Sequence, residues 1–139
     1  VPRPPQRSQA SAEAAVARIL IAEDEEPLRT LIQRALTEEG HAVVATADGA
    51  EALDVLVSKQ GNFDLLLADI KMPVMDGIAL ALAVARDFPN LPILLMTGYA
   101  DQRERVSGLE ALICDVIAKP FALAEIKFAV ASAVAKGKR

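Results

Sequence analysis

Residues 63–68 read Phe-Asp-Leu-Leu-Leu-Ala, a short and mostly apolar run that ends at an acidic residue, Asp69. Two further apolar runs, at residues 19–22 and 91–96, are similarly short. Apolar runs of this length, with little alternation of polar residues, are typical of strands buried on both faces of a parallel sheet. The stretch therefore predicts a central strand of such a sheet, with Asp69 at its carboxyl end.

Helical patterns separate the predicted strands. Apolar residues recur at helical spacing after Pro27 and stop at Gly40, which predicts a helix between them. Further helices are predicted over residues 48–58, with Asp48 as the N-cap, and over 77–87, 101–109 and 123–134. Further strands are predicted over residues 41–46 and 113–118. This alternation predicts an α/β fold, a doubly wound (βα)5 three-layer sandwich around a parallel five-stranded sheet.

The composition limits the class of protein. A chain of 139 residues suits one domain, and 53% hydrophobic with 24% charged residues excludes general disorder. The net charge of −4 argues against direct binding of nucleic acid, which needs a basic face. A single cysteine, Cys114, excludes an internal disulfide framework.

The organisation of the chain is equally simple. Residues 1–17 are rich in Pro, Ser, Gln and Ala and are expected to form a flexible tail or linker. The folded domain is expected over residues 18–136. No apolar run approaches the roughly 18 residues of a membrane span, and we expect a cytoplasmic setting without membrane contact.

Polar residues follow four of the five predicted strands. Glu23 and Asp24 follow the first strand, Asp69 the third, Thr97 the fourth and Lys119 the fifth. Because the carboxyl ends of parallel strands lie at one edge of a sheet, where ligands bind in such folds, we expect these side chains to form one site.

The residue types at this edge favour one chemistry. Clustered carboxylates repel one another and require a cation, and their hard oxygen atoms suit Mg²⁺ or Mn²⁺. Asp69, at the centre, is a candidate carboxylate nucleophile that would form an aspartyl phosphate. The ammonium group of Lys119 and the hydroxyl group of Thr97 would then contact the phosphoryl oxygens.

Four motifs together resemble the receiver domain of two-component response regulators over about residues 18–135. They are Ile19-Leu20-Ile21-Ala22-Glu23-Asp24-Glu25, Asp69-Ile70-Lys71-Met72-Pro73-Val74-Met75-Asp76-Gly77, Leu95-Met96-Thr97-Gly98 and Lys119-Pro120-Phe121. The resemblance implies a flavodoxin-like fold with strand order 2-1-3-4-5. It also implies a cis peptide bond between Lys119 and Pro120.

The same resemblance implies a function and a set of roles. Asp69 would accept a phosphoryl group from a histidine kinase or a histidine phosphotransfer protein. Glu23, Asp24, Asp69 and the backbone carbonyl of Lys71 would hold Mg²⁺. The chain would catalyse only its own phosphorylation and dephosphorylation. It would act by changing its affinity for an output protein, and members of the family also form homodimers.

Several residues stand apart from this pattern. Val116 occupies the position on the fifth strand where the family often has a tyrosine or phenylalanine that works with the threonine. Tyr99 is either a reporter of phosphorylation or a half-buried surface residue. We expect His41 to be structural and Cys114 to be a small buried hydrophobe. The four phenylalanines are expected to be packing residues: Phe63, Phe88, Phe121 and Phe128.

Two other functions of similar folds fit the sequence less well. A phosphatase of the haloacid dehalogenase type needs a second carboxylate two residues after the nucleophile, but that position is Lys71. A flavodoxin-like electron carrier needs a phosphate-binding loop after the first strand, but Glu23–Glu26 would repel phosphate. Within the receiver family, the chain is either a stand-alone regulator or the terminal receiver of a hybrid histidine kinase or an intermediate in a phosphorelay.

Overall fold

The computed structural model describes residues 16–98 and 105–137 of the chain. The helices are α2 (Glu26–Glu38), α3 (Gly49–Ser58), α4 (Gly77–Asp87) and α6 (Leu123–Gly137). The strands are β1 (Arg18–Ala22), β2 (Ala42–Thr46), β3 (Leu65–Asp69), β4 (Ile93–Thr97) and β5 (Asp115–Ala118). All neighbouring strands pair in parallel in the order β2-β1-β3-β4-β5, which confirms the predicted fold and strand order.

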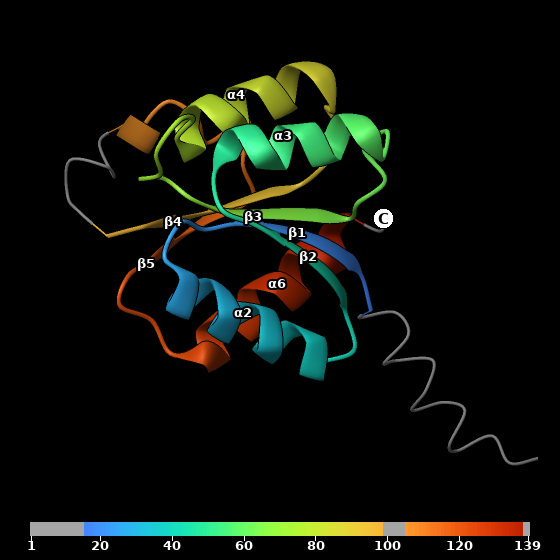
Figure 1. The fold of residues 1–139 in the computed structure, drawn as a ribbon, viewed down its shortest axis with the longest axis vertical. Coiled ribbons are helices and arrows are strands. Elements are labelled where there is room, and N and C mark those ends of the chain that lie inside the picture. Colours follow the sequence, from blue (N-terminus) through green and yellow to red (C-terminus); the bar gives the residue numbers. More distant parts are fainter. Residues whose placement is uncertain (1–15, 99–104, 138–139) are drawn as a thin grey trace, which may run out of the picture.

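The helices cover both faces of the sheet. Figure 1 shows α3 and α4 on one face and α2 and α6 on the other. Successive residues of a strand point to opposite faces, so each central strand supplies both layers. Leu20 and Leu66 belong to the core beneath α3 and α4, and their neighbours Ile19 and Leu65 to the core beneath α2 and α6. Burying a leucine or isoleucine side chain stabilises a fold by roughly 1.5–3 kcal/mol, so these two aliphatic layers hold the sheet.

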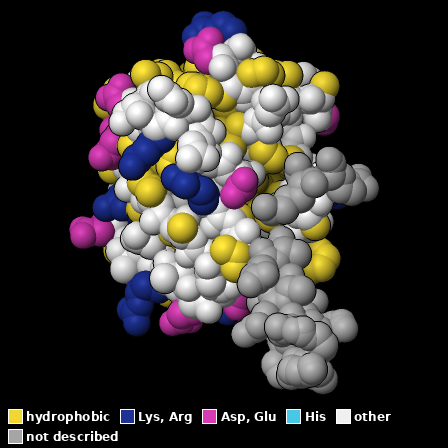
Figure 2. Space-filling view, turned by 90° about the vertical axis from the view of Figure 1, so that its right-hand side faces the viewer, with side chains coloured by type: hydrophobic (Ala, Val, Ile, Leu, Met, Phe, Trp, Pro, Cys, Tyr) yellow, Lys and Arg dark blue, Asp and Glu magenta, His cyan; other side chains and the backbone are white. Residues whose placement is uncertain are grey.

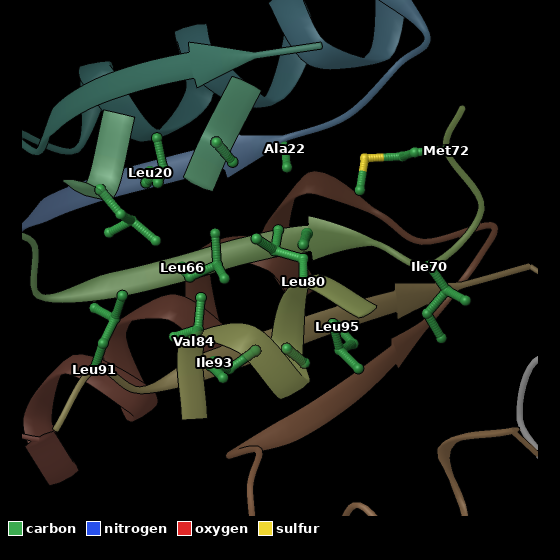
Figure 3. Packing of buried hydrophobic residues seen from close by; sticks show 14 of the residues in the cluster. Leu20, Ala22, Leu66, Ile70, Met72, Leu80, Val84, Leu91, Ile93 and Leu95 are labelled. Atoms are coloured by element: carbon green, nitrogen blue, oxygen red, sulfur yellow. The ribbon is translucent and has the colours of Figure 1, made fainter. Parts of the chain in front are cut away.

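Figure 3 shows the layer between the sheet and the α3–α4 pair. Leu80 and Val84 of α4 pack there against side chains of the central strands, including Leu66 and Leu95. Ile70 belongs to this layer although it lies just beyond β3, and it is fully buried. The residue after Asp69 is therefore anchored in the core, which limits how far the backbone of Asp69 can move.

Local signals set the helix boundaries. The side chain of Asp48 accepts a hydrogen bond from the backbone N–H of Glu51 at 2.8 Å, which confirms the predicted N-cap of α3. Asp76 caps α4 in the same way through Ala79 at 2.9 Å. The predicted helix over residues 101–109 lies partly outside the described residues. Within its described part, Arg105 and Val106 are helical and turns follow.

The strands begin later than their apolar runs. The runs at 63–68 and 91–96 were predicted as strands, whereas β3 and β4 start at Leu65 and Ile93. Phe63 and Leu91 are nevertheless buried in the α3–α4 layer, because the approach to each strand also packs against the core. In these two runs, hydrophobicity therefore marks where the chain is buried and not where strand pairing begins.

Two packing predictions are wrong at the β5 edge of the sheet. Cys114 is exposed, and the Phe128 side chain is 76% exposed. β5 pairs with β4 along one side only, so residues next to this outer strand have a face without strand neighbours. Phe63, in contrast, is buried as predicted.

His41 has a structural position at the other end of the sheet. It is buried, and its Nδ1 atom accepts a hydrogen bond from the backbone N–H of Ala17 at 3.0 Å. Figure 2 shows the side of the molecule that carries the amino-terminal ends of the strands, where basic, acidic and hydrophobic side chains are interspersed. The predicted tail, residues 1–17, lies almost wholly outside the described residues and stays a prediction.

Candidate functional site

The carboxyl ends of the strands bring the predicted site residues to one edge of the sheet. The strand register places Ala22 beside Ala68, Asp69 beside Met96, and Thr97 beside Ala118. The residues that follow β1 and β5, Glu23 and Lys119, therefore flank Asp69 and Thr97. Glu23 is fully buried, while Asp69 and Thr97 are 4% and 1% exposed.

Three carboxylates share this edge. Glu23, Asp24 and Asp69 each offer an oxygen atom, and these oxygen atoms all lie within 4.8 Å of one another. Lys119 reaches into the group, with its Nζ atom 2.7 Å from Asp69 Oδ2 and 3.4 Å from Glu23 Oε1. The backbone N–H of Glu25 donates to the other oxygen of Glu23 at 3.0 Å. The Lys119 ammonium group thus contacts two of the three clustered carboxylates.

The electrostatics of the group reflect this imbalance. Burial, with the nearby charge of Asp69, raises the pKa of Glu23 to about 7, although the Glu25 N–H and Lys119 oppose the rise. For Lys119, burial acts to lower the pKa, but the hydrogen bond and charge of Asp69, together with Glu23, raise it above its usual value. Lys119 is therefore charged at neutral pH, and the carboxylates have room for further positive charge.

A cavity of about 600 Å³ opens directly onto these groups. Asp24, Asp69, Lys71 and Lys119 line its polar part. Leu28 of α2 and Pro120 and Phe121 after β5 form an apolar wall. The site thus combines a charged floor with an apolar side, and the two are supplied by different loops.

The structure places each predicted site residue at this edge. Glu23, Asp24, Asp69 and Lys119 lie in direct proximity. Thr97 ends β4, and its carbonyl oxygen accepts a hydrogen bond from the backbone N–H of Lys119 at 2.7 Å. Lys71 lines the same cavity. The Lys119–Pro120 peptide bond is cis, as expected. Tyr99, the candidate reporter of phosphorylation, lies outside the described residues.

Sequence reasoning missed Arg29 of α2. Its guanidinium group donates a hydrogen bond to the backbone carbonyl of Glu23 at 2.8 Å, which fixes the backbone that presents the acidic pair. A signal was available in the sequence. A cation near the amino-terminal end of a helix opposes the helix dipole, so an arginine there calls for an external partner.

A comparison with protein families decides between the chemistries that this geometry allows. Residues 19–131 match the response regulator receiver domain. The chain belongs to this family. Receiver domains are phosphoacceptor signalling domains of two-component systems, in which response regulators take phosphoryl groups from histidine kinases and act on output partners. They bind Mg²⁺ at an acidic pocket, and the acidic group described above is such a cluster.

Relatives of this receiver domain occur in different protein contexts. The response regulator MprA of Mycobacterium avium is 38% identical over 109 residues, which are 78% of this chain and 47% of that protein. The chain thus spans about half the length of such relatives. The receiver domain of a signal transduction histidine kinase from Syntrophus aciditrophicus is 30% identical, with a TM-score of 0.78, over 88% of this chain and 93% of that chain.

A third relative was solved with ligands. The response regulator TrrA of Thermotoga maritima, in complex with Mg²⁺-BeF, is 32% identical, with a TM-score of 0.74, over 84% of this chain and 97% of that chain. Val116, where the resemblance implied an aromatic residue, lies on β5 of this receiver domain. Val116 is half-buried and packs against the α3–α4 layer.

Among the described residues, no helix combines the length and apolar character needed to cross a membrane.

Proposed function

We propose that Asp69 is the phosphoacceptor of this receiver domain. The observation that carries the proposal is the position of its carboxylate. Asp69 is almost fully buried, contacts the Lys119 ammonium group at 2.7 Å and borders a 600 Å³ cavity. An incoming phosphoryl donor can approach through the cavity, where the Lys119 ammonium group already supplies one positive charge toward a phosphoryl group.

The transfer follows from these positions. An Asp69 oxygen attacks the phosphorus of a phosphohistidine, the new O–P bond forms, and the N–P bond breaks. The electron pair leaves with the donor imidazole, which takes up a proton. Lys119 stabilises the negative charge on the transferring group. Thr97, the last residue of β4, would donate its hydroxyl hydrogen to a phosphoryl oxygen. In this transfer the chain would catalyse its own modification.

We assign the Mg²⁺ site to Glu23, Asp24, Asp69 and the backbone carbonyl of Lys71. The donor set supports this assignment, because three clustered carboxylates offer the hard oxygen ligands that a divalent cation such as Mg²⁺ prefers. The complex of TrrA with Mg²⁺-BeF supports it as well. When bound, Mg²⁺ would neutralise charge on the transferring phosphoryl group. Mn²⁺ offers similar chemistry to the same oxygen ligands.

The phosphoryl donor would be a histidine kinase or a histidine phosphotransfer protein. The apolar wall formed by Leu28, Pro120 and Phe121 supports a protein donor, because apolar contacts beside the charged floor suit a partner surface. Phosphorylation would then change the affinity for an output protein, either a separate protein or a second copy of the chain. Such signalling requires that the partner bind the two states with different affinities.

A second context is favoured by one comparison. The receiver domain of the Syntrophus histidine kinase matches over nearly its full length. This chain would in that case be the receiver of a hybrid kinase or an intermediate of a phosphorelay. Return of the phosphoryl group from Asp69 to a histidine phosphotransfer protein distinguishes the two contexts, since a terminal response regulator would transfer it to water instead.

The phosphoacceptor is tested by intact-protein mass spectrometry after incubation with acetyl phosphate, with and without Mg²⁺. We expect a gain of one phosphoryl group that depends on Mg²⁺ and is lost in Asp69→Ala. Asp54 is an exposed aspartate on α3, so Asp54→Ala is the matched control and should be phosphorylated like the wild type. A gain that persists in Asp69→Ala would overturn the assignment of Asp69.

A further inference from the structure

The loop between Asp69 and α4 is held closely against the backbone of Asp69. A Cβ atom on Gly77 would lie 2.2 Å from the carbonyl oxygen of Asp69, so only a glycine fits there without a shift. The backbone N–H of Gly77 also donates to the carbonyl of Ile70 at 2.8 Å. A shift of Gly77, the first residue of α4, would therefore also shift the backbone of Asp69, the proposed phosphoacceptor.

Asp76, just before Gly77, is held from two sides. One carboxylate oxygen accepts the Ala79 N–H at 2.9 Å and so caps α4. The other accepts a hydrogen bond from the guanidinium group of Arg105 at 2.7 Å. Partial burial acts to raise the pKa of Asp76, but the Ala79 N–H and Arg105 together hold it below its usual value. The carboxylate is thus ionised and engaged at neutral pH.

Arg105 comes from a different part of the chain. It lies in the segment that connects β4 to β5, downstream of Thr97. Its neighbour Val106 is 5% exposed and belongs to the same core layer as Ile70 and Met72. The backbone of Arg105 is thereby held in place, so the ion pair with Arg105 restrains the position of Asp76.

We propose that Arg105 is a positioning residue for phosphoryl transfer, which holds Asp76 and Gly77 against Asp69 and couples the β4–β5 segment to the phosphoacceptor loop. The proposal rests on the function proposed above. The Arg105–Asp76 contact connects the segment after Thr97 to the loop after Asp69, and it lies outside the phosphoacceptor site. The loop between Asp69 and Asp76 contains Lys71, whose carbonyl is assigned to Mg²⁺, so a looser loop should weaken Mg²⁺ binding.

The position of the ion pair distinguishes it from an ordinary surface pair. The Arg105 and Asp76 side chains are 49% and 28% exposed and lie 29 positions apart in the chain. The pair Arg86–Asp87 has a similar length, 2.8 Å, but joins adjacent residues of α4 and is more exposed, at 73% and 44%. Breaking the Arg86–Asp87 pair should leave the site unchanged, so Arg86→Gln is a matched control.

The experiment compares Arg105→Gln, Asp76→Asn, the double variant and Arg105→Lys. Asn retains the capping oxygen of Asp76 and loses its charge. The first readout is the Mg²⁺ concentration that gives half the maximal rate of phosphorylation by acetyl phosphate. The second readout needs neither Mg²⁺ nor phosphorylation. It is the hydrogen-exchange rate of the Gly77 amide in the metal-free protein, measured by NMR spectroscopy.

We expect Arg105→Gln to raise the half-maximal Mg²⁺ concentration about two- to fivefold, the range for a partly exposed ion pair. Gly77 exchange should accelerate by a similar factor. Asp76→Asn should change both readouts to the same extent, and the double variant should change them no further. Arg105→Lys should retain part of the wild-type behaviour. Arg86→Gln should leave both readouts unchanged. Unchanged Gly77 exchange, or additive effects in the double variant, would overturn the proposal. Absence of phosphorylation in the wild type would instead count against the proposed function, because the exchange readout is independent of it.

Discussion

Polar side chains are buried at both ends of the sheet, but in different surroundings. At the carboxyl ends of the strands, the buried carboxylates of Glu23 and Asp69 contact the Lys119 ammonium group and cluster with the exposed Asp24 beside an open cavity. At the amino-terminal ends, His41 is also buried, and its Nδ1 atom is occupied by the N–H of Ala17.

Hydrogen bonding alone does not explain the difference. Among the described residues, every buried side-chain nitrogen or oxygen atom has a hydrogen-bond partner. The two ends differ in charge. The acidic end clusters three carboxylates beside a cavity, whereas the buried histidine at the other end has a lowered pKa and is uncharged at neutral pH. Burial of polar groups therefore marks a ligand site only where charge is left uncompensated next to a cavity.

The largest effect is expected from removing the cation at the acidic end. Lys119→Met should slow phosphorylation by acetyl phosphate about a hundredfold, because one preorganised charge at the transferring group is lost. Rates are measured by intact-protein mass spectrometry at saturating Mg²⁺. Lys127→Met is the control, since Lys127 pairs at 3.8 Å with Glu39, away from the site. Similar rates for Lys119→Met and the wild type would remove Lys119 from the mechanism.

The next effect concerns the packing of the loop at the acidic end. Gly77→Ala should lower the free energy of unfolding by about 1–3 kcal/mol, since its new methyl group would collide with the Asp69 carbonyl. Urea unfolding measures the change. Gly98→Ala is the comparison, because its Cβ atom would meet Lys119 Cδ at 3.7 Å, an ordinary contact. Equal stability of the two variants would show that the loop yields easily and does not hold Asp69.

The histidine end should respond to acid. Burial lowers the pKa of His41, while the charge of Glu39 opposes this. The unfolded chain therefore takes up a proton first, near the ordinary pKa of about 6.5. Stability that is fully present above this pH is lost as the pH falls towards the lower pKa of the folded state. The loss should approach the value of a buried hydrogen bond, about 0.5–1.5 kcal/mol.

His41→Asn isolates this effect. The side-chain oxygen of asparagine can accept the Ala17 N–H at every pH, so the stability difference between the variant and the wild type should change across this pH range. The chain has one histidine, so its NMR titration is free of overlap. Parallel stability curves for the two proteins would show that the hydrogen bond is dispensable.

The smallest effect comes from backbone strain. Val74, in the loop after Asp69, has a φ angle of 67° and is 84% exposed. A β-branched residue in this left-handed region costs about 1–2 kcal/mol, and asparagine tolerates it better. Val74→Asn should therefore raise the free energy of unfolding by about 1 kcal/mol. At the other end of the sheet, Gln60 has a φ angle of 57° but no β-branch, so Gln60→Asn should gain less. A larger gain at Gln60 would contradict this account of strain.

The sequence was sufficient for the fold and for the place of the site. Short apolar runs separated by helical patterns predicted the parallel sheet, and its geometry then placed Glu23, Asp69 and Lys119 at one edge. This inference works because parallel strands all end on the same side. The resemblance to a receiver domain added the strand order, which alternation alone does not specify.

The failures have two physical origins. Cys114 and Phe128 are apolar but exposed, because hydrophobicity does not reveal that β5 is the outer strand of the sheet. Arg29 and Arg105 were missed because each acts on a residue of another element, Glu23 or Asp76. Long side chains that reach between segments leave no periodic pattern, and for Arg29 the available signal is its position near the amino-terminal end of α2.

The central claim is that the uncompensated acidic end of the sheet is a phosphoryl acceptor with Asp69 as its nucleophile. The most direct measurement is to phosphorylate the protein with acetyl phosphate and Mg²⁺, reduce it with borohydride and map the peptides by mass spectrometry. Borohydride reduces an aspartyl phosphate to homoserine and so marks the acceptor permanently. The account predicts homoserine at position 69, dependent on both Mg²⁺ and donor. Homoserine at another aspartate such as Asp24, with Asp69 intact, would contradict it.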